Sequence, residues 1–239
     1  MSAMATGTLY LIPVPLGPVA PEACLPPATL EVARRLDCFV VERAKTARAH
    51  LKAMGHPLPL QRIEMRELNE HTRDSELDAL LAPLLAGRDL GLLSEAGCPA
   101  VADPGANLVA AAHHAGIAVA PLIGPSAILL TLMASGLGGQ RFAFHGYLPA
   151  KEPERAQAIR ALELAARKQD STQLFIETPY RAAALLDALA ATLAPDTLIS
   201  VGADLTLPGQ TIHTRCAAAW QGLGAQIKDR LVVFAVATP

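Results

Sequence analysis

Short apolar runs alternate with longer amphipathic segments along most of the chain. Runs such as Thr8–Ile12, Cys38–Val41 and Leu90–Leu93 are too short for helices and predict buried strands. Between them, segments such as Lys45–Met54 have helical spacing and end at glycine or proline. Strand, loop and helix repeated in this way predict βαβ units around a parallel sheet, whose strands are apolar throughout because both faces are buried.

The remaining elements follow from the same criteria, and together they predict an α/β fold. We expect further strands at Gln61–Met65, Ile117–Leu122, Phe142–His145, Gln173–Ile176, Thr197–Val201, Gln210–Thr214 and Leu231–Val236. We expect further helices at Thr29–Leu36, Asp74–Ala86, Pro104–Ala115, Ser126–Ser135 and Tyr180–Leu193, one charged helix ending at Lys168, and a short one around Ala217–Gly222. Thr29 and Asp74 are predicted to cap their helices.

The segment Gly146–Pro153 interrupts this pattern with a glycine, two prolines and mixed charge. We therefore predict two α/β domains that meet there. Residues 1–146 form the first, with a mostly parallel sheet and flanking helices. Residues 147–239 form a smaller second domain with a mixed sheet.

One long stretch without charge, from Pro104 to Gln140, has to be tested as a membrane span. A spanning helix needs about 20 apolar residues. Gly116, Pro121 and Gly124 divide this stretch into pieces that are too short. The N-terminal region has no basic residue before its prolines, unlike a signal peptide. We expect no membrane segment.

Composition narrows the class of protein. The chain is 51% apolar and 18% charged, which excludes a disordered protein. The formal net charge of −2 gives no general preference for nucleic acid. The four cysteines form no C-x-x-C pair, so neither a zinc site nor a redox motif is expected, and isolated reduced thiols favour a cytoplasmic protein. We predict no metal site.

Three loops rich in Gly, Ala, Ser and Pro follow predicted strands, at Pro13–Gly17, Ser94–Gly105 and Gly124–Ala127. Ligands of open parallel sheets bind beyond the carboxyl ends of the strands, and small residues let a ligand approach the backbone. The second and third loops lead into helices, whose free N–H groups favour an anionic group such as a carboxylate. Ordinary turns are the alternative. The glycine fingerprints for bound phosphates are missing, which favours a cofactor without phosphates.

Six segments of the chain together resemble the tetrapyrrole methylase superfamily of S-adenosylmethionine (SAM) dependent methyltransferases. They are GTLYLIPVPLG, VERAKTARAHLKAMG, LLSEAGCPAVADPG, LIGPSAILLTLMASGL, FAFHGYLP and FIETPYR, and they appear in this order. Within the superfamily, the chain resembles a divergent branch of the ribosomal RNA small-subunit methyltransferase I group, which methylates a ribose 2′-hydroxyl of a cytidine. It departs from that group at Pro18, Arg43, Glu95 and Cys98.

The resemblance implies that SAM binds between two α/β domains, usually in a homodimer. The first domain would hold the substrate cleft and the cofactor loops, and the second would complete the SAM site. Carried over by position, the cofactor-binding residues are Leu16, Glu95, Ala96, Gly97, Cys98, Val101, Ser126, Ala127, Thr178 and Ala203.

A hydroxyl acceptor must lose a proton, so a general base assists the transfer. The candidates are Glu42, Glu70, His71, Asp74 and Glu177, and we favour Glu177 with Glu42 beside it. An ion pair between Glu177 and Arg181 is the alternative for Glu177, and a capping turn is the alternative for the segment LNEHTRD.

An RNA substrate would need a basic surface. Arg43, Lys45, Arg48 and Lys52 fall within ten residues without an acid, and the last three share one helix face. We assign Arg43, Lys45, Arg48 and His71 to the substrate. A second basic cluster, Lys151 to Lys168, is diluted by acids. A solvated charged face is the alternative for both, and the pI of about 6.4 weighs against tight RNA binding.

The resemblance implies a SAM-dependent methyltransferase that acts on an RNA ribose 2′-hydroxyl and functions in rRNA processing. Methylation of a tetrapyrrole or another small molecule, or SAM binding without catalysis, are the alternatives.

Overall fold

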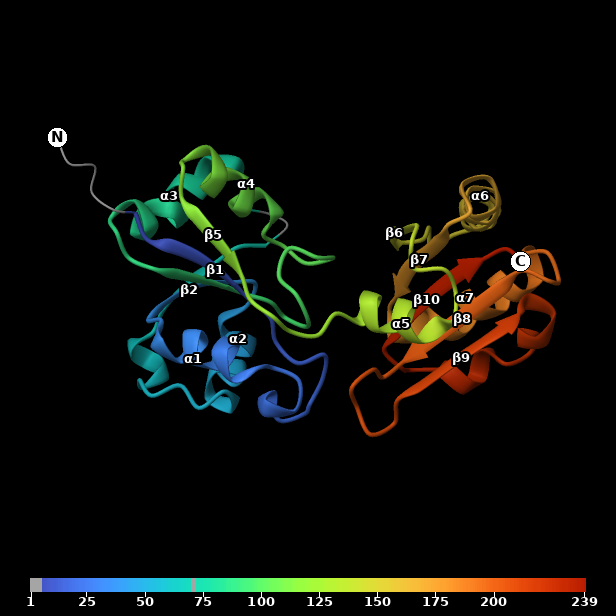
Figure 1. The fold of residues 1–239 in the computed structure, drawn as a ribbon, viewed down its shortest axis with the longest axis horizontal. Helices are drawn as coiled ribbons and strands as arrows, with labels where there is room; N and C mark the ends of the chain where they lie inside the picture. The colour runs from blue at the N-terminus through green and yellow to red at the C-terminus, as the bar shows by residue number, and fades with distance from the viewer. Residues whose placement is uncertain (1–5, 70–71) are drawn as a thin grey trace. The chain divides into compact units, whose positions relative to one another are not determined.

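The protein is described by a computed structural model that covers residues 6–69 and 72–239 (Figure 1). It divides into two compact units, residues 1–125 and residues 126–239. Each unit is built on its own sheet, so each is described by itself.

Unit 1 is built on a parallel sheet. Its strands are β1 (Thr8–Ile12), β2 (Cys38–Val41), β3 (Glu64–Glu67), β4 (Leu90–Leu93) and β5 (Ala118–Pro121). Their order across the sheet is β3-β2-β4-β1-β5. β1 pairs in parallel with β4 and β5, and β2 pairs in parallel with β4 and β3.

Helices cover both faces of this sheet. They are α1 (Pro27–Arg35), α2 (Ala44–Ala53), α3 (Asp74–Leu85) and α4 (Ala106–His114), with short 3₁₀ turns at Pro21–Ala23 and Leu60–Arg62. α1 and α2 lie on one face, and α3 and α4 lie on the other (Figure 1).

The side chains of β2 show why these strands are apolar at every position. Cys38 and Val40 pack into the cluster formed with α3 and α4, whereas Phe39 and Val41 pack into the cluster formed with α1 and α2. Phe39 is fully buried. Burial of a side chain of this size stabilises the fold by roughly 1.5–3 kcal/mol. The continuous apolar run is therefore required by burial on both faces.

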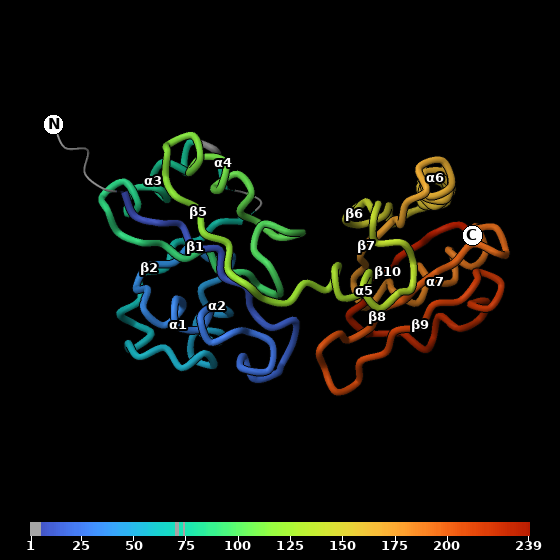
Figure 2. Tube along the Cα trace, in the orientation of Figure 1, coloured from blue at the N-terminus to red at the C-terminus, as the bar shows by residue number. Residues whose placement is uncertain are grey.

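The chain leaves two neighbouring strands toward opposite faces of the sheet. After β1 it continues to α1, and after β4 it continues to α4 (Figure 2). β1 and β4 are adjacent in the sheet, so this is the topological switch point at which parallel α/β sheets open a ligand-binding crevice.

Unit 2 is built on a mixed sheet. Its strands are β6 (Phe142–Tyr147), β7 (Thr172–Glu177), β8 (Leu198–Ala203), β9 (Thr211–Cys216) and β10 (Val232–Ala237). Their order is β6-β7-β10-β8-β9. β6 and β7 are parallel, whereas β10 is antiparallel to β7 and β8, and β9 is antiparallel to β8.

Helices flank this sheet too. They are α5 (Ala127–Ser135), α6 (Glu154–Gln169) and α7 (Pro179–Thr192), with 3₁₀ turns at Ala217–Trp220 and Gly224–Ile227. α6 and α7 share a core cluster in which the rings of Phe175 and Phe234 stack 5.4 Å apart. α5 packs on the other face of the sheet, against Leu174, Val233 and Ala235. The two units thus have the parallel and mixed sheets that the sequence predicts.

The division into units differs from the predicted boundary between residues 1–146 and 147–239. Ile128 and Leu132 of α5 pack on the sheet of unit 2, and β6 pairs with β7. Both elements therefore belong to the second unit, which begins at Ser126. The Gly- and Pro-rich segment Gly146–Pro153 is a connection inside that unit.

Several predicted element ends also differ. Thr29 does not cap α1 but lies within it, and its hydroxyl donates to the Ile123 carbonyl oxygen at 2.8 Å. Arg73, rather than Asp74, is the N-cap of α3. The strand expected at Gln61–Met65 begins at Glu64, because a 3₁₀ turn occupies the preceding residues. Among the helices in the described part of the chain, none is both long and apolar enough to cross a membrane.

Candidate active site

Two of the predicted loops follow neighbouring strands of unit 1, and the third begins near them. Pro13–Gly17 follows β1, Ser94–Gly105 follows β4, and the segment that leads to Gly124 follows β5. Since β4, β1 and β5 are adjacent and parallel, their carboxyl ends meet at one edge of the sheet.

The loops after β1 and β4 are joined by a short backbone bridge. The N–H of Val14 donates to the Gly97 carbonyl at 3.0 Å, and the N–H of Gly97 donates back to the Val14 carbonyl at 3.1 Å. Gly97 has a φ of +71°, which a side chain disfavours. A Cβ at Gly97 would also lie 3.1 Å from Leu16 Cδ2 and 3.3 Å from the Pro125 carbonyl oxygen.

The segment after β5 packs against both of the other loops. The thiol of Cys98 donates to the Pro125 carbonyl oxygen at 3.4 Å. A Cβ at Gly124 would lie only 2.3 Å from Pro13 Cβ, so glycine is required by this close approach. Burial raises the pKa of the Cys98 thiol, which favours its neutral, hydrogen-bonding form. The three loops therefore form one packed cluster.

A carboxylate holds the loop after β4 in shape. Asp103 Oδ2 accepts hydrogen bonds from the Ser94 hydroxyl at 2.7 Å and from the Glu95 N–H at 3.4 Å. Burial raises the pKa of Asp103 above its ordinary value, although the hydrogen bond from Ser94 opposes that shift. This contact has no periodic signal in the sequence, because it joins residues nine apart within a loop.

The same loop contains residues in the left-handed backbone region. Ala100 has a φ of +62° and Ala102 a φ of +57°. Each costs roughly 1–2 kcal/mol relative to an ordinary conformation. The strain is offset by the Asp103 hydrogen bonds and by the bridge to Val14, and such strain is found at ligand-binding loops.

The predicted cofactor residues of this cluster present a mixed surface. Leu16, Glu95 and Cys98 are half-buried, whereas Ala96 and Val101 are exposed. Gly97 is buried in the backbone bridge. Apolar contacts and one carboxylate are therefore available side by side.

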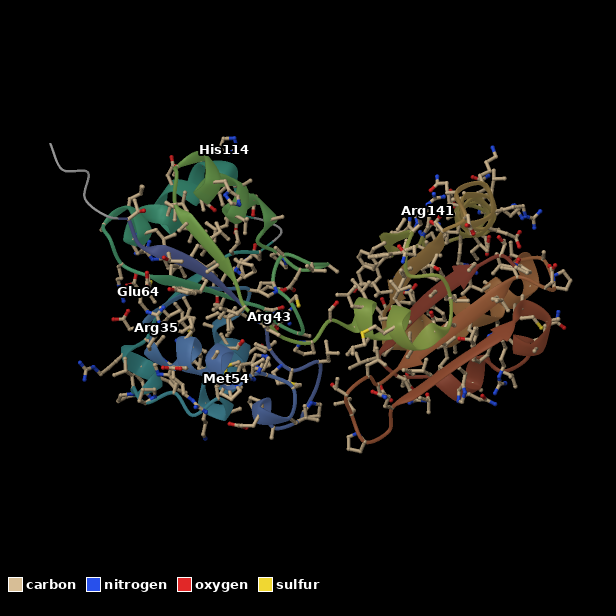
Figure 3. The ribbon with its side chains drawn as sticks, viewed as in Figure 1. Arg35, Arg43, Met54, Glu64, His114 and Arg141 are labelled. Carbon is tan, nitrogen blue, oxygen red and sulfur yellow. The ribbon has the colours of Figure 1, made fainter. Side chains whose placement is uncertain are left out.

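The basic helix face predicted from the sequence begins at this edge of the sheet. Glu42 and Arg43 follow β2, the neighbour of β4, and Arg43 is the N-cap of α2 (Figure 3). Arg43 contacts Glu42 at 3.5 Å, yet its side chain is 72% exposed. Farther along the helix, His50 Nε2 lies 3.1 Å from the Glu95 carbonyl oxygen. This contact ties α2 to the loop after β4.

The other basic residues of α2 point to solvent. Lys45, Arg48 and Lys52 are exposed, and they form no ion pair within residues 6–69 and 72–239. His71, assigned to the substrate, and Glu70, a candidate base, lie outside the described residues.

Glu177, the favoured base, is held in a structural ion pair in unit 2. Its Oε1 accepts hydrogen bonds from Arg181 Nη2 at 2.6 Å, from Arg181 Nε at 2.9 Å and from the Thr178 N–H at 2.6 Å. These contacts raise the pKa of Arg181. Glu177 is 7% exposed. The alternative left open by the sequence, an ion pair with Arg181, is present in the structure.

The remaining cofactor residues lie in unit 2. Ser126 is the N-cap of α5, and its hydroxyl accepts from the Leu129 N–H at 3.5 Å. Ala127 follows it and is half-buried. Thr178 caps α7 at the carboxyl end of β7, and its hydroxyl donates to Glu177. Ala203 ends β8, and its side chain is fully buried in the core, so a ligand would meet only its backbone.

Comparison with known proteins gives consistent matches. A family model described as Tetrapyrrole (Corrin/Porphyrin) Methylases matches residues 8–219. The ribosomal RNA small subunit methyltransferase I of Escherichia coli O157:H7 is 33% identical over 207 residues, which cover 87% of this chain and 68% of that protein. The protein of the same name from Xylella fastidiosa is 33% identical over 206 residues, 86% of this chain and 71% of that protein.

Solved structures share the fold. The crystal structure of the methyltransferase CobJ superposes with a TM-score of 0.63 and 20% identity, covering 98% of this chain and 100% of CobJ. At that identity the likeness supports the architecture of two α/β units and no more.

Proposed function

The chain belongs to the tetrapyrrole (corrin/porphyrin) methylase family, and from that premise we propose that it transfers the methyl group of SAM to ribosomal small-subunit RNA. The acceptor is a ribose 2′-hydroxyl. The observation that carries the proposal is the cluster of three loops at the switch point of the parallel sheet, joined by the Val14–Gly97 bridge. No phosphate fingerprint is needed there, because SAM carries no phosphate.

The residues at this cluster fit SAM chemically. Leu16 and Val101 offer apolar surface for an adenine ring, and the half-buried Glu95 carboxylate suits a ribose hydroxyl or the ammonium group. We propose as the cofactor-binding residues Leu16, Glu95, Ala96, Gly97, Cys98, Val101, Ser126, Ala127, Thr178 and Ala203. Bound SAM supplies an electrophilic methyl group, and the protein binds and orients the reactants.

The basic face of α2 supports RNA as the acceptor. Arg43, Lys45 and Arg48 are exposed, and α2 is tied to the cofactor loop through His50 and the Glu95 carbonyl. Phosphates of an RNA strand on this face would bring a nearby ribose to the loop cluster of the same unit. We keep His71 as a further substrate residue on the sequence alone, because it lies outside the described residues.

A base is proposed to take the proton that the 2′-hydroxyl loses as the carbon–oxygen bond forms. Glu42 and Glu177 are the candidates. Within residues 6–69 and 72–239, the ion pair of Glu42 is a long contact of 3.5 Å with Arg43, whereas Glu177 Oε1 accepts several short hydrogen bonds. The side chain of Glu177 is 4% exposed and that of Glu42 is 24% exposed, so the Glu42 carboxylate has more room to contact an acceptor hydroxyl, and we place Glu42 first and Glu177 second.

The proposal is tested with methyl-labelled SAM and deproteinised small-subunit RNA, with a porphyrinogen as a parallel acceptor. We expect SAM to bind in calorimetry and label to enter RNA, recovered as 2′-O-methylcytidine after nuclease digestion. Label found only in the porphyrinogen would mean that the acceptor is a tetrapyrrole and not RNA. SAM binding without transfer to either acceptor would indicate a non-catalytic SAM-binding protein, and failure to bind SAM would overturn the whole proposal.

A matched pair of variants tests the acceptor face. The double change Lys45→Gln and Arg48→Gln should raise KM for RNA and leave the affinity for SAM unchanged. Arg35→Gln changes an exposed arginine of α1 that pairs with Asp89 before β4, at the opposite end of the strands from Arg43, and it should leave both unchanged. An equal loss in both proteins would show that only total charge matters.

We further propose that the protein is a cytoplasmic homodimer. Sedimentation of the purified protein tests the oligomeric state directly, and cell fractionation tests the location.

A further inference from the structure

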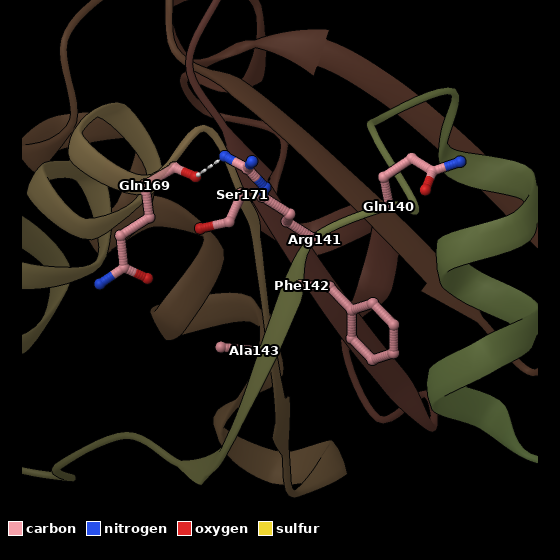
Figure 4. Close-up of a pocket in the computed structure, with 6 residues that line it drawn as sticks. All are labelled: Gln140, Arg141, Phe142, Ala143, Gln169 and Ser171. Atoms are coloured by element: carbon pink, nitrogen blue, oxygen red, sulfur yellow. Dashed lines mark hydrogen bonds between the residues drawn. The ribbon is translucent and has the colours of Figure 1, made fainter.

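Unit 2 has a hollow at the edge of its sheet where β6 and β7 begin. Its volume is about 380 Å³, and a second hollow of about 400 Å³ adjoins it and shares Gln140, Arg141 and Ser171. The first is lined by Gln140, Arg141, Phe142, Ala143, Gln169 and Ser171 (Figure 4). Glu177 and Thr178 lie at the other end of β7, so the hollow is separate from the residues discussed for cofactor binding in this unit.

Arg141 gives the hollow a cation with free donors. Its Nη1 donates one long hydrogen bond, at 3.4 Å, to the Gln169 carbonyl oxygen (Figure 4). No carboxylate in the described part of the chain pairs with it. Arg167 and Lys168 add exposed positive charge in the last turn of α6, against one negative charge on Asp170. The local field therefore favours an anion.

The buried side chain of Gln173 holds Ser171, the second donor of the hollow, in place. Gln173 is 1% exposed, and its Nε2 donates to Ser171 Oγ at 2.7 Å and to the Ser171 carbonyl at 3.1 Å. Its Oε1 accepts from His145 Nε2 at 2.7 Å, which sets the orientation of the amide. Because Ser171 Oγ already accepts a hydrogen bond, its own O–H is left to donate into the hollow. Arg141 and Ser171 therefore present donors on the same wall.

The Phe142 ring lies around the edge strand β6 from Ser171, on the side of α5, and it suits a nucleobase (Figure 4). Phe142 is 45% exposed, so its ring is open to stacking. The amides of Gln140 and Gln169 can both donate to and accept from a base edge. A cation, a hydroxyl donor, an aromatic face and two amides match the parts of one nucleotide.

We propose that this hollow binds one nucleotide of single-stranded RNA, with the phosphate on Arg141 and Ser171 and the base on Phe142. This rests on the proposed function, because it assigns a second RNA contact to a protein whose acceptor is RNA. The contact lies on unit 2, whereas the basic face of α2 lies on unit 1, so a long RNA acceptor would be held at two places.

The test measures the binding of a short fluorescein-labelled single-stranded RNA by anisotropy, at a series of salt concentrations. Arg141→Gln should weaken binding roughly five- to tenfold at low salt and reduce the slope of log K against log salt by about 0.7, the value for one phosphate of a single strand. Phe142→Leu should weaken binding roughly fivefold or more with the slope unchanged, because stacking is lost and charge is kept. Melting temperatures establish that both variants are folded.

Arg160→Gln is the matched control. Arg160 is an exposed arginine of α6 that does not line the hollow, so its loss should change binding less than twofold. Equal effects of Arg141→Gln and Arg160→Gln would overturn the proposal in favour of a merely solvated charged surface. Unchanged binding by Phe142→Leu would overturn the stacking of a base.

The binding assay needs no methyl transfer, so the two proposals fail separately. RNA methylation together with unaltered RNA binding by Arg141→Gln would overturn this site and leave the function. Binding that depends on Arg141 and Phe142 in a protein that never methylates RNA would support the site and overturn the function.

Discussion

The backbones of Val14 and Gly97 exchange two hydrogen bonds, of 3.0 and 3.1 Å, beyond the ends of β1 and β4. The bridge ties together two loops whose chains leave toward opposite faces of the sheet. It is an isolated antiparallel bridge beyond the parallel pairing of β1 and β4, and it fixes the floor of the proposed SAM site.

Gly97→Ala should damage this bridge. Alanine would have to adopt the positive φ of this position, which its Cβ disfavours, and that Cβ would lie 3.1 Å from Leu16 Cδ2. We expect the free energy of unfolding to fall by about 1–2 kcal/mol, and the affinity for SAM to fall with it. Chemical denaturation and calorimetry measure the two effects.

Gly116→Ala provides a matched control for Gly97→Ala. Gly116 has a φ of +68°, but nothing lies within 4 Å of a Cβ built on it. It should lose similar stability through its backbone and retain full SAM affinity. If both variants bind SAM equally well, the bridge does not shape the cofactor site.

Asp103→Asn should change how stability depends on pH. Burial raises the pKa of Asp103 in the folded protein, so the folded state holds its proton more tightly than the unfolded state. The contribution of Asp103 to stability is therefore greatest below the unfolded pKa and declines as pH rises from there through the folded pKa. Asparagine keeps an acceptor for Ser94 and has no charge to bury.

Melting curves between acid and neutral pH test this sign. The stability of Asp103→Asn relative to the unaltered protein should increase as pH rises above about 4 and then level off. A relative stability that declines over the same range would mean that the carboxylate charge stabilises the loop.

Glu42→Gln and Glu177→Gln separate catalysis from structure. If Glu42 is the base, its variant should lose roughly 10²–10⁴-fold in kcat with SAM affinity retained. Glu177→Gln removes the charged partner of Arg181 and should lower the free energy of unfolding by about 1–3 kcal/mol. Single-turnover kinetics and chemical denaturation are measured for both variants. A larger loss of kcat in Glu177→Gln than in Glu42→Gln, at unchanged stability, would make Glu177 the first candidate for the base.

Ala127→Trp should abolish SAM binding by filling space at the start of α5. Ala115→Trp, at an exposed helix end in unit 1, should bind SAM normally. Because Ala127 also packs beside the core of unit 2, Ala96→Trp serves as a second variant at an exposed position. Calorimetric titration measures the SAM affinity of all three variants. Full affinity in both Ala127→Trp and Ala96→Trp would mean that SAM binds elsewhere.

Strand positions could be predicted wherever burial dictates the pattern. β1, β2 and β4 have the bounds expected from their apolar runs. β3 begins later than predicted because its sequence, EMRE, contains three charged residues, and its position depends on pairing with β2 rather than on its own apolar character. The parallel order of the sheet likewise follows from short strands separated by helices.

The border between the units could not be read from the chain, because α5 is apolar almost all round. Ile128 and Leu132 face the sheet of unit 2, while the equally apolar Met133 is 79% exposed. No periodicity shows which sheet such a helix covers. A Gly- and Pro-rich segment was therefore mistaken for a border between compact units.

Loop positions at the candidate site were predictable, whereas their internal contacts were not. Proline and glycine mark the loops, and the parallel topology brings their strands together. The hydrogen bond from Ser94 to Asp103 and the chain from His145 through Gln173 to Ser171 depend on loop conformation and sheet pairing. Sequence spacing contains no trace of either.

The order β4-β1-β5 also determines when β1 can pair with its neighbours during synthesis of the chain. During synthesis β1 has no sheet neighbour until β4, residues 90–93, has followed it, and its second neighbour, β5, ends only at Pro121. Until then its apolar surface must be shielded by chaperones or by loose collapse. Nascent chains stalled before residue 90 should therefore remain sensitive to proteases, and protection should arise abruptly once β5 has emerged.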